Sequence, residues 1–242
     1  MQGSGELPYL YINLSQYENQ HIEEFLEFLY STPDHEFKRT IRIRISQSPA
    51  IDVGGVFRDK IGSVFQFLLN SDIFVMNEAS NMKTFRPFIN RMGYQQRKAQ
   101  YIAFGKIYYW SVIVRRCIPF PNNMDPAILA YGIYGDNLPT SCLETTHPLR
   151  QMVETVSWFT NETQRDDIIR ILEPWREQCC IDLNYAVTQI MDVNGGRMPF
   201  LKALFKNAVF NDANDAFEYF REGFIGEDRA FPSVYHLRGS LS

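Results

Sequence analysis

The stretch YIAFGKIYYWSVIV, from Tyr101 to Val114, decides the fold because it is apolar on every side of a helix. A helix of this kind lies in the core of a protein. The stretch is too short to cross the hydrocarbon layer of a membrane, and Lys106 interrupts it. We therefore predict a buried helix over residues 93–117, which ends before Pro119.

Periodic patterns on both sides of this stretch predict the other elements. Residues 41–45 alternate isoleucine with arginine, which is the period of a half-buried strand, and shorter strands are predicted at 73–76 and 84–89. Apolar residues at helical spacing predict further helices over 15–31, 56–70, 126–134, 146–159, 162–178, 180–191, 198–210 and 213–224. The expected fold class is α+β and mainly helical.

Composition excludes several classes of protein. The 242 residues are 45% hydrophobic, which is enough for a sizeable core and argues against disorder. The net charge is −4 and the basic residues are dispersed, so we expect no nucleic-acid partner. No charged-then-apolar leader opens the chain, so we expect no secretion, no membrane association and a cytoplasmic or nuclear location.

Residues with catalytic or metal-binding chemistry do not form a recognisable motif. The cysteines, Cys117, Cys142, Cys179 and Cys180, show neither a C-x-x-C pair nor metal-ligand spacing, and packed thiols in a reducing compartment explain them. The four histidines are scattered, and His21 is expected at the surface. There is no zinc-protease motif and no nucleophile elbow. We expect no catalytic residue, no cofactor and no metal.

Three stretches, in this order, resemble the N-lobe of the HECT-type ubiquitin ligase domain. They are Ile41–Ser46 with Ala50–Asp59, then Phe104–Ile107 with Ile118–Pro121, then Ala216–Phe224. In the family, the first stretch is a strand followed by an aspartate and a Gly-Gly pair that open a helix. The second is a long buried helix with a proline-bearing loop, and the third is an aromatic helix end. The resemblance covers roughly residues 15–224. It departs from the family at Ser46–Pro49, where a Glu-Gly is usual, and is loose between Tyr134 and Gly223.

This resemblance implies transfer of ubiquitin from a ubiquitin-conjugating enzyme (E2) to a cysteine of a C-lobe, and then to a substrate lysine. The family's cysteine follows a Thr-Cys-Phe-Asn-like signature, which this sequence lacks. The chain is therefore expected to dock E2, with ubiquitin as a further partner, and to be inactive as a ligase by itself. A degenerate HECT-like scaffold without E2 binding is the alternative. A small-molecule enzyme that uses Cys179 or Cys180 is a third reading.

The resemblance also implies two parts and a docking groove. Residues 1–135 and 210–242 would form the larger subdomain, with small β elements, and residues 136–209 an inserted E2-binding subdomain. The segment Thr146-His147-Pro148-Leu149 resembles the start of one groove helix. The groove residues would be Leu149, Val153 and Val156, on one helix face, with Phe200 and Leu204 opposite. From the pattern alone, such a stripe is more often the packed side of a helix; a groove requires an accessible patch.

Overall fold

The structure, a computed structural model, describes residues 9–39, 41–46, 55–77, 81–87, 94–114, 123–160, 164–177, 179–210 and 213–226. These residues are mainly helical with two small sheets, which confirms the coarse fold class. Among them, no helix has the length and apolar character that a membrane span needs. The loop with Asp52 and Gly54, and the prolines Pro119 and Pro121, lie outside the described residues.

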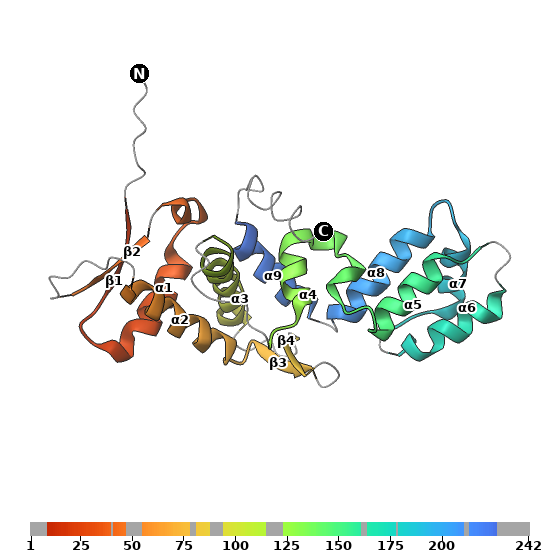
Figure 1. Cartoon of the computed structure of the whole chain (residues 1–242), viewed down its shortest axis with the longest axis horizontal. Helices are drawn as coiled ribbons and strands as arrows, with labels where there is room; N and C mark the ends of the chain where they lie inside the picture. Colours follow the sequence, from red (N-terminus) through yellow and green to blue (C-terminus); the bar gives the residue numbers. More distant parts are fainter. Residues whose placement is uncertain are drawn as a thin grey trace, which may run out of the picture.

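The helices and strands follow one another along an elongated molecule (Figure 1). The helices are α1 (His21–Ser31), α2 (Gly55–Leu69), α3 (Tyr94–Tyr108), α4 (Pro126–Tyr134), α5 (Pro148–Ser157), α6 (Arg165–Leu172), α7 (Leu183–Met191), α8 (Arg197–Phe210) and α9 (Asn214–Ile225). The strands are β1 (Leu10–Leu14), β2 (Ile41–Ile45), β3 (Phe74–Asn77) and β4 (Met82–Phe85).

The predicted buried helix is α3, which continues into a π-helical segment, η3 (Tyr109–Val114). Side chains of Phe104 and Ile107 are completely shielded from solvent. Lys106, the charged residue in the stretch, donates from Nζ to the carbonyl oxygens of Leu29 and Thr32 at the end of α1, at 3.2 and 3.1 Å. The ammonium group is thereby accommodated at a helix C-terminus, where a positive charge is favourable.

Helices α3 and α9 pack together with their backbones in contact, and two glycines make this possible. A Cβ atom on Gly105 would lie 2.1 Å from the carbonyl oxygen of Phe220, and one on Gly223 would lie 2.0 Å from that of Ile102. No side chain larger than hydrogen fits at either position. Phe104–Ile107, from the second stretch quoted above, and Ala216–Phe224, the third, therefore lie on two helices that interlock, whereas Ile118–Pro121 lies outside the described residues.

Aromatic rings fill the space around this helix pair. Phe85 of β4 lies with its ring centroid 5.0 Å from that of Phe217 and 5.2 Å from that of Tyr101. The fully buried rings of this cluster come from α2, α3, α9 and the β3–β4 hairpin: Phe65, Phe85, Tyr101, Phe104, Tyr108, Phe217, Phe220 and Phe224. Tilted and edge-on ring pairs of this kind add to the stabilisation from burial.

Two small sheets flank the helices. Strand β1 pairs in parallel with β2, with Leu10 opposite Ile41, and β3 pairs antiparallel with β4. Strand β2 was predicted, whereas β1 was missed. The predicted strand at 84–89 begins earlier, at Met82. The helix predicted from residue 15 begins at His21, because residues 15–20 form an extended connection and a short 3-10 turn.

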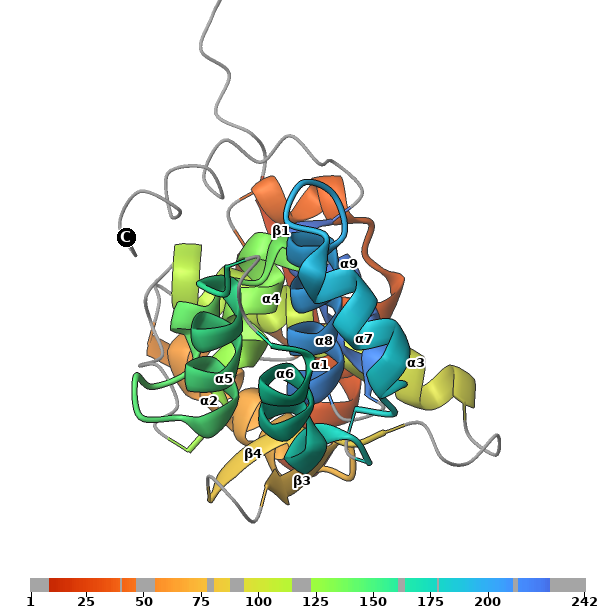
Figure 2. The same cartoon turned by 90° about the vertical axis from the view of Figure 1, so that its right-hand side faces the viewer.

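The chain leaves this body after α4 and returns to it through α8 and α9. We call the described residues from Tyr9 to Tyr134 and from Ala213 to Gly226 the framework, and Gly135–Phe210 the inserted segment. Helices α5–α8 lie at the end of the molecule opposite β1 and β2, and Figure 2 shows them in front of the framework. Phe210 stacks on Phe217 with ring centroids 4.1 Å apart, which joins the two parts. The predicted boundaries at 135/136 and 209/210 stay a prediction.

Candidate functional site

The first helix predicted for the groove is α5, which packs against α8 and α6. Pro148 occupies its first position, and His147 Nδ1 accepts a hydrogen bond from the Leu149 backbone N–H at 3.2 Å. Proline at this position has no N–H to leave unpaired, and a capping acceptor satisfies one of the free donors. The stretch Thr146-His147-Pro148-Leu149 therefore starts a helix, as expected.

Four of the five predicted groove residues are inside the protein. Leu149, Val153 and Val156 on α5 are 2%, 6% and 0% exposed, and Leu204 on α8 is 4% exposed. They form the packing layer of the inserted segment, so the accessible stripe that a groove requires is not found at these positions. Helical spacing shows which side chains share a face but not what covers that face. Phe200 alone is half-buried.

The accessible apolar surface of the inserted segment lies beside Phe200. The ring of Tyr185 on α7, 58% exposed, stands edge-on to Phe200 with centroids 6.1 Å apart. Four further large apolar side chains of this segment are exposed: Trp158, Met191, Val193 and Met198. Sequence reasoning missed them because none belongs to the buried stripes. The sequence does hold a signal for two of these exposed residues, because Tyr185 and Met198 are apolar residues that fall outside the buried faces of α7 and α8.

A buried arginine fixes the helix ends below these residues. Arg197, 5% exposed, donates from Nη1 to the carbonyl oxygen of Phe159 at 2.6 Å and from Nε to that of Ile190 at 2.5 Å. It thus ties the chain after α5 to α7 at the start of α8. In the preceding turn, the carboxylate of Asp192 accepts from the backbone N–H groups of Gly195 and Gly196. The base of the exposed surface is therefore well ordered by polar contacts.

Two of the described cysteines, Cys142 and Cys179, do not resemble catalytic nucleophiles. Burial raises the pKa of the Cys142 thiol to about 12 and that of the Cys179 thiol to about 11. The thiolate is the nucleophilic form, so both groups are almost fully protonated at neutral pH. Cys180 is exposed, and Cys117 lies outside the described residues. In the described part of the chain, no group of three His, Cys, Asp or Glu side chains is placed to hold a metal ion.

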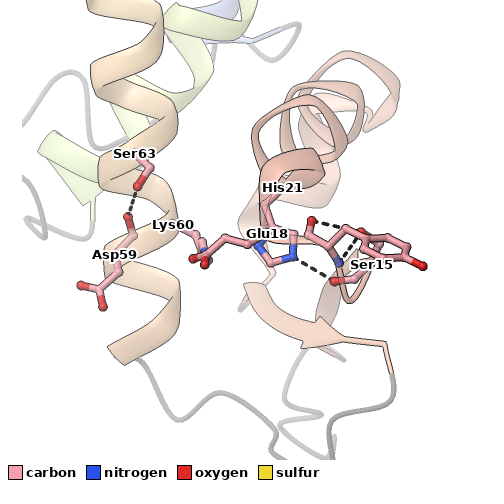
Figure 3. Close-up of polar contacts among 7 residues, drawn as sticks. Ser15, Glu18, His21, Asp59, Lys60 and Ser63 are labelled. Atoms are coloured by element: carbon pink, nitrogen blue, oxygen red, sulfur yellow. Dashed lines mark hydrogen bonds and ion pairs between the residues drawn. The ribbon is translucent and has the colours of Figure 1, made fainter.

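Histidine 21 was expected at the surface, but it is 6% exposed (Figure 3). Its Nε2 lies 2.9 Å from the carbonyl oxygen of Ser15, not from the serine hydroxyl, so the two do not form a nucleophile–base pair. Beside them, Lys60 of α2 reaches Glu18 with 2.6 Å between Nζ and Oε1, and this contact lowers the pKa of Glu18. The cluster joins β1, α1 and α2, which is a structural role.

Comparison of the sequence with protein-family models and with curated proteins gives no match. Function is therefore inferred from the residues of this chain and from their contacts. The two features that bear on it are the interlocked pair α3 and α9, and the exposed surface around Tyr185 and Phe200.

Proposed function

We propose that this chain is the N-lobe of a HECT-type ubiquitin ligase and that its inserted segment docks a ubiquitin-conjugating enzyme. The three resembling stretches support the proposal by their order along the chain. The contact of α3 with α9 also supports it, because Phe104–Ile107 of the second stretch lies on α3 and the third stretch lies on α9. The family places its E2-binding part between these two stretches, which is where the inserted segment lies in this chain.

The observation that carries the docking proposal is the accessible aromatic pair of Tyr185 and Phe200. Aromatic side chains and methionine are enriched at the centres of protein interfaces, and a few aromatic anchors supply most of the binding free energy. Tyr185 is 58% exposed on α7, and Phe200 on α8 is half-buried beside it. We therefore assign the docking surface to Tyr185 and Phe200. Leu149, Val153, Val156 and Leu204 support it from below.

The chemical step of ubiquitin transfer needs a cysteine that this sequence does not identify. It has no Thr-Cys-Phe-Asn-like signature, and burial holds Cys142 and Cys179 in the thiol form. In this proposal the chain contributes position: it holds E2 so that ubiquitin reaches an acceptor cysteine elsewhere. Such docking is transient, because E2 must leave after it has transferred its ubiquitin.

Titration with a panel of E2 enzymes tests the proposal. Tyr185→Asp and Phe200→Asp are each expected to weaken binding by about tenfold or more, the usual effect of losing an aromatic anchor. Tyr17→Asp is the matched control, because Tyr17 is 56% exposed on the framework, and it should leave binding unchanged. Circular dichroism verifies that each variant is folded. Unchanged binding by folded Tyr185→Asp and Phe200→Asp variants would remove the docking surface.

The second candidate function is a HECT-like interaction module that does not bind E2. The exposed apolar residues of the inserted segment favour it equally, because they mark a partner site without naming the partner. Failure of the wild-type chain to bind any E2 of a broad panel would support this candidate. Pull-down of a different protein that depends on Tyr185 and Phe200 would then identify what the surface binds.

A further inference from the structure

The β1–β2 sheet has one covered face and one open face. Alternation along the strands directs Ile12, Leu14 and Ile43 into the core, where they are 1%, 2% and 1% exposed. The opposite face carries Tyr11 of β1, Tyr9 directly before β1, and Arg42 and Arg44 of β2. Parallel strands are normally covered on both faces. In this structure the described elements leave the second face open.

The two arginines lean over the tyrosines of the neighbouring strand. Arg42 Cζ lies 3.5 Å from the ring centroid of Tyr9, and Arg44 Cζ lies 4.3 Å from that of Tyr11. Within the described part of the chain, neither guanidinium has a carboxylate or carbonyl partner. Stacking on a ring orients the planar group but uses none of its N–H donors. The guanidinium groups of both arginines are therefore oriented and still able to form bidentate hydrogen bonds with a carboxylate.

The edge of β1 beside this face is also open. The Ser46 N–H donates a hydrogen bond to the Leu14 carbonyl oxygen, with 2.8 Å between N and O. With the parallel register of the two strands, this bond means that the backbone groups of Leu10, Ile12 and Leu14 point toward β2. The backbone groups of Tyr11 and Asn13 then point away from β2. Asn13 is exposed and Tyr11 half-buried, and β1 pairs with β2 alone among the described strands. A further strand can bond to such an edge.

We propose that this edge and face bind an extended acidic segment of another protein. The segment adds to β1 as a third strand, and its carboxylates at alternate positions meet Arg42 and Arg44. The spacing fits, because residues two apart on a strand are about 6.6 Å apart in both strands. Nucleic acid fits less well, since the chain has net charge −4 and the face offers two arginines rather than a basic track.

This inference is independent of the proposed E2 docking. The β1–β2 sheet lies at one end of the molecule and the inserted segment at the other (Figure 1). Substitution of Arg42 and Arg44 should therefore leave E2 binding through Tyr185 and Phe200 unchanged. Loss of one binding activity without the other distinguishes failure of this inference from failure of the proposed function.

Fluorescence anisotropy with a labelled peptide of alternating valine and glutamate tests the inference. The peptide should bind the full chain, whereas the same peptide with lysine in place of glutamate should not. Arg42→Gln combined with Arg44→Gln is expected to weaken binding by about tenfold or more, because charge-assisted hydrogen bonds are lost. The control combines Arg170→Gln with Arg176→Gln, two exposed arginines of the inserted segment, and should bind like the wild type.

Methylation of alternate backbone nitrogens of the peptide tests the edge separately from the face. It should abolish binding, because an added strand needs those N–H groups. This measurement uses the unaltered protein, so it holds even if the arginine variants do not fold. The inference is overturned if the glutamate peptide does not bind at millimolar concentration, or if the lysine peptide binds equally. It is also overturned if a single-stranded oligonucleotide or anionic vesicles bind more tightly than the peptide.

Discussion

The framework and the inserted segment bury different kinds of side chain. In the framework, aromatic rings surround the α3–α9 contact, and Tyr101, Phe104 and Phe220 are among those that are almost completely buried. In the inserted segment the core is largely aliphatic, with Leu149, Val156 and Ile190 as examples, while Trp158 and Tyr185 are exposed. Aromatic rings therefore fill most of the framework core, whereas mostly aliphatic side chains fill the core of the inserted segment.

Helix contact distance explains much of this difference. Where backbones touch at Gly105 and Gly223, the neighbouring rings fill the space beside the contact, as Phe104 and Phe220 do with centroids 5.8 Å apart. In the inserted segment, α5 and α8 meet through side chains such as Val153 and Leu204. A mostly aliphatic layer fills that space, and Phe205 of α8 is the buried ring nearest in sequence to Leu204.

The largest expected effect is that of a methyl group in the helix contact. Gly105→Ala places a Cβ against the backbone of α9, so the helices must separate, and we expect a loss of about 3 kcal/mol or more of unfolding free energy. Gly62→Ala is the control: its Cβ meets no atom within 4 Å, and alanine should stabilise α2 by about 0.5–1 kcal/mol. Urea unfolding measures both. Similar effects of the two substitutions would show that the α3–α9 contact does not determine stability.

Arg197→Met is expected to act on the inserted segment alone. It leaves the carbonyl oxygens of Phe159 and Ile190 without their donor, and loss of charge-assisted bonds costs about 1.5–3 kcal/mol. Hydrogen exchange should become faster in α5, α7 and α8 and stay unchanged in α3 and α9. Lys202→Met, at an exposed position of α8, should change neither region. Equally faster exchange in α3 would mean that the two parts unfold together.

The cap of α4, at the junction of the two parts, gives a pH-dependent test. Asp125 Oδ1 accepts from the Ala127 N–H at 2.9 Å, and burial raises the pKa of this carboxyl despite that bond and the nearby His147. The pKa of the Asp125 carboxyl is therefore higher in the folded than in the unfolded protein, where it is about 4. Its contribution to the free energy of unfolding is full below pH 4 and declines as the pH rises through the folded pKa.

Asp125→Asn keeps an acceptor but has no charge, so it should remove this decline and be at least as stable as the wild type at neutral pH. Asp125→Ala should lose about 1 kcal/mol with the cap. Unfolding free energies at several pH values between 4 and 7 measure the effect. A wild-type contribution that increases with pH over this range would contradict the assignment.

The smallest expected effect is that of replacing an exposed tryptophan, for which a buried tryptophan is the reference. Trp158 in the inserted segment is 83% exposed, so Trp158→Ser should change the free energy of unfolding by no more than about 0.5 kcal/mol. Trp110 in the framework is 4% exposed, and its ring centroid lies 4.6 Å from that of Phe57. Trp110→Ser should therefore lower the free energy of unfolding by about 3 kcal/mol or more. Thermal unfolding compares them. A large loss for Trp158→Ser would mean that this ring supports the fold instead of facing a partner.

Much of the secondary structure could be predicted from local pattern. The apolar stretch at Tyr101–Val114 gave a buried helix, and the Ile–Arg alternation gave β2. Strand β1 was missed because Asn13 is unfavourable in strands and the pairing partner of β1 lies 31 residues away, at Ile41–Ile45. His21 was placed at the surface because the sequence does not show that the Ser15 carbonyl lies against its ring.

The sequence by itself determined which side chains share a face and the helical class of the protein, and it led to the proposal of a HECT N-lobe. Only the tertiary structure decided that Val153 and Leu204 are buried, that Tyr185 and Phe200 stay accessible, and that Arg42 and Arg44 lie over tyrosines. Periodicity is a property of one segment, whereas the cover over a face comes from segments distant in the chain. Their contacts are therefore not encoded in local spacing.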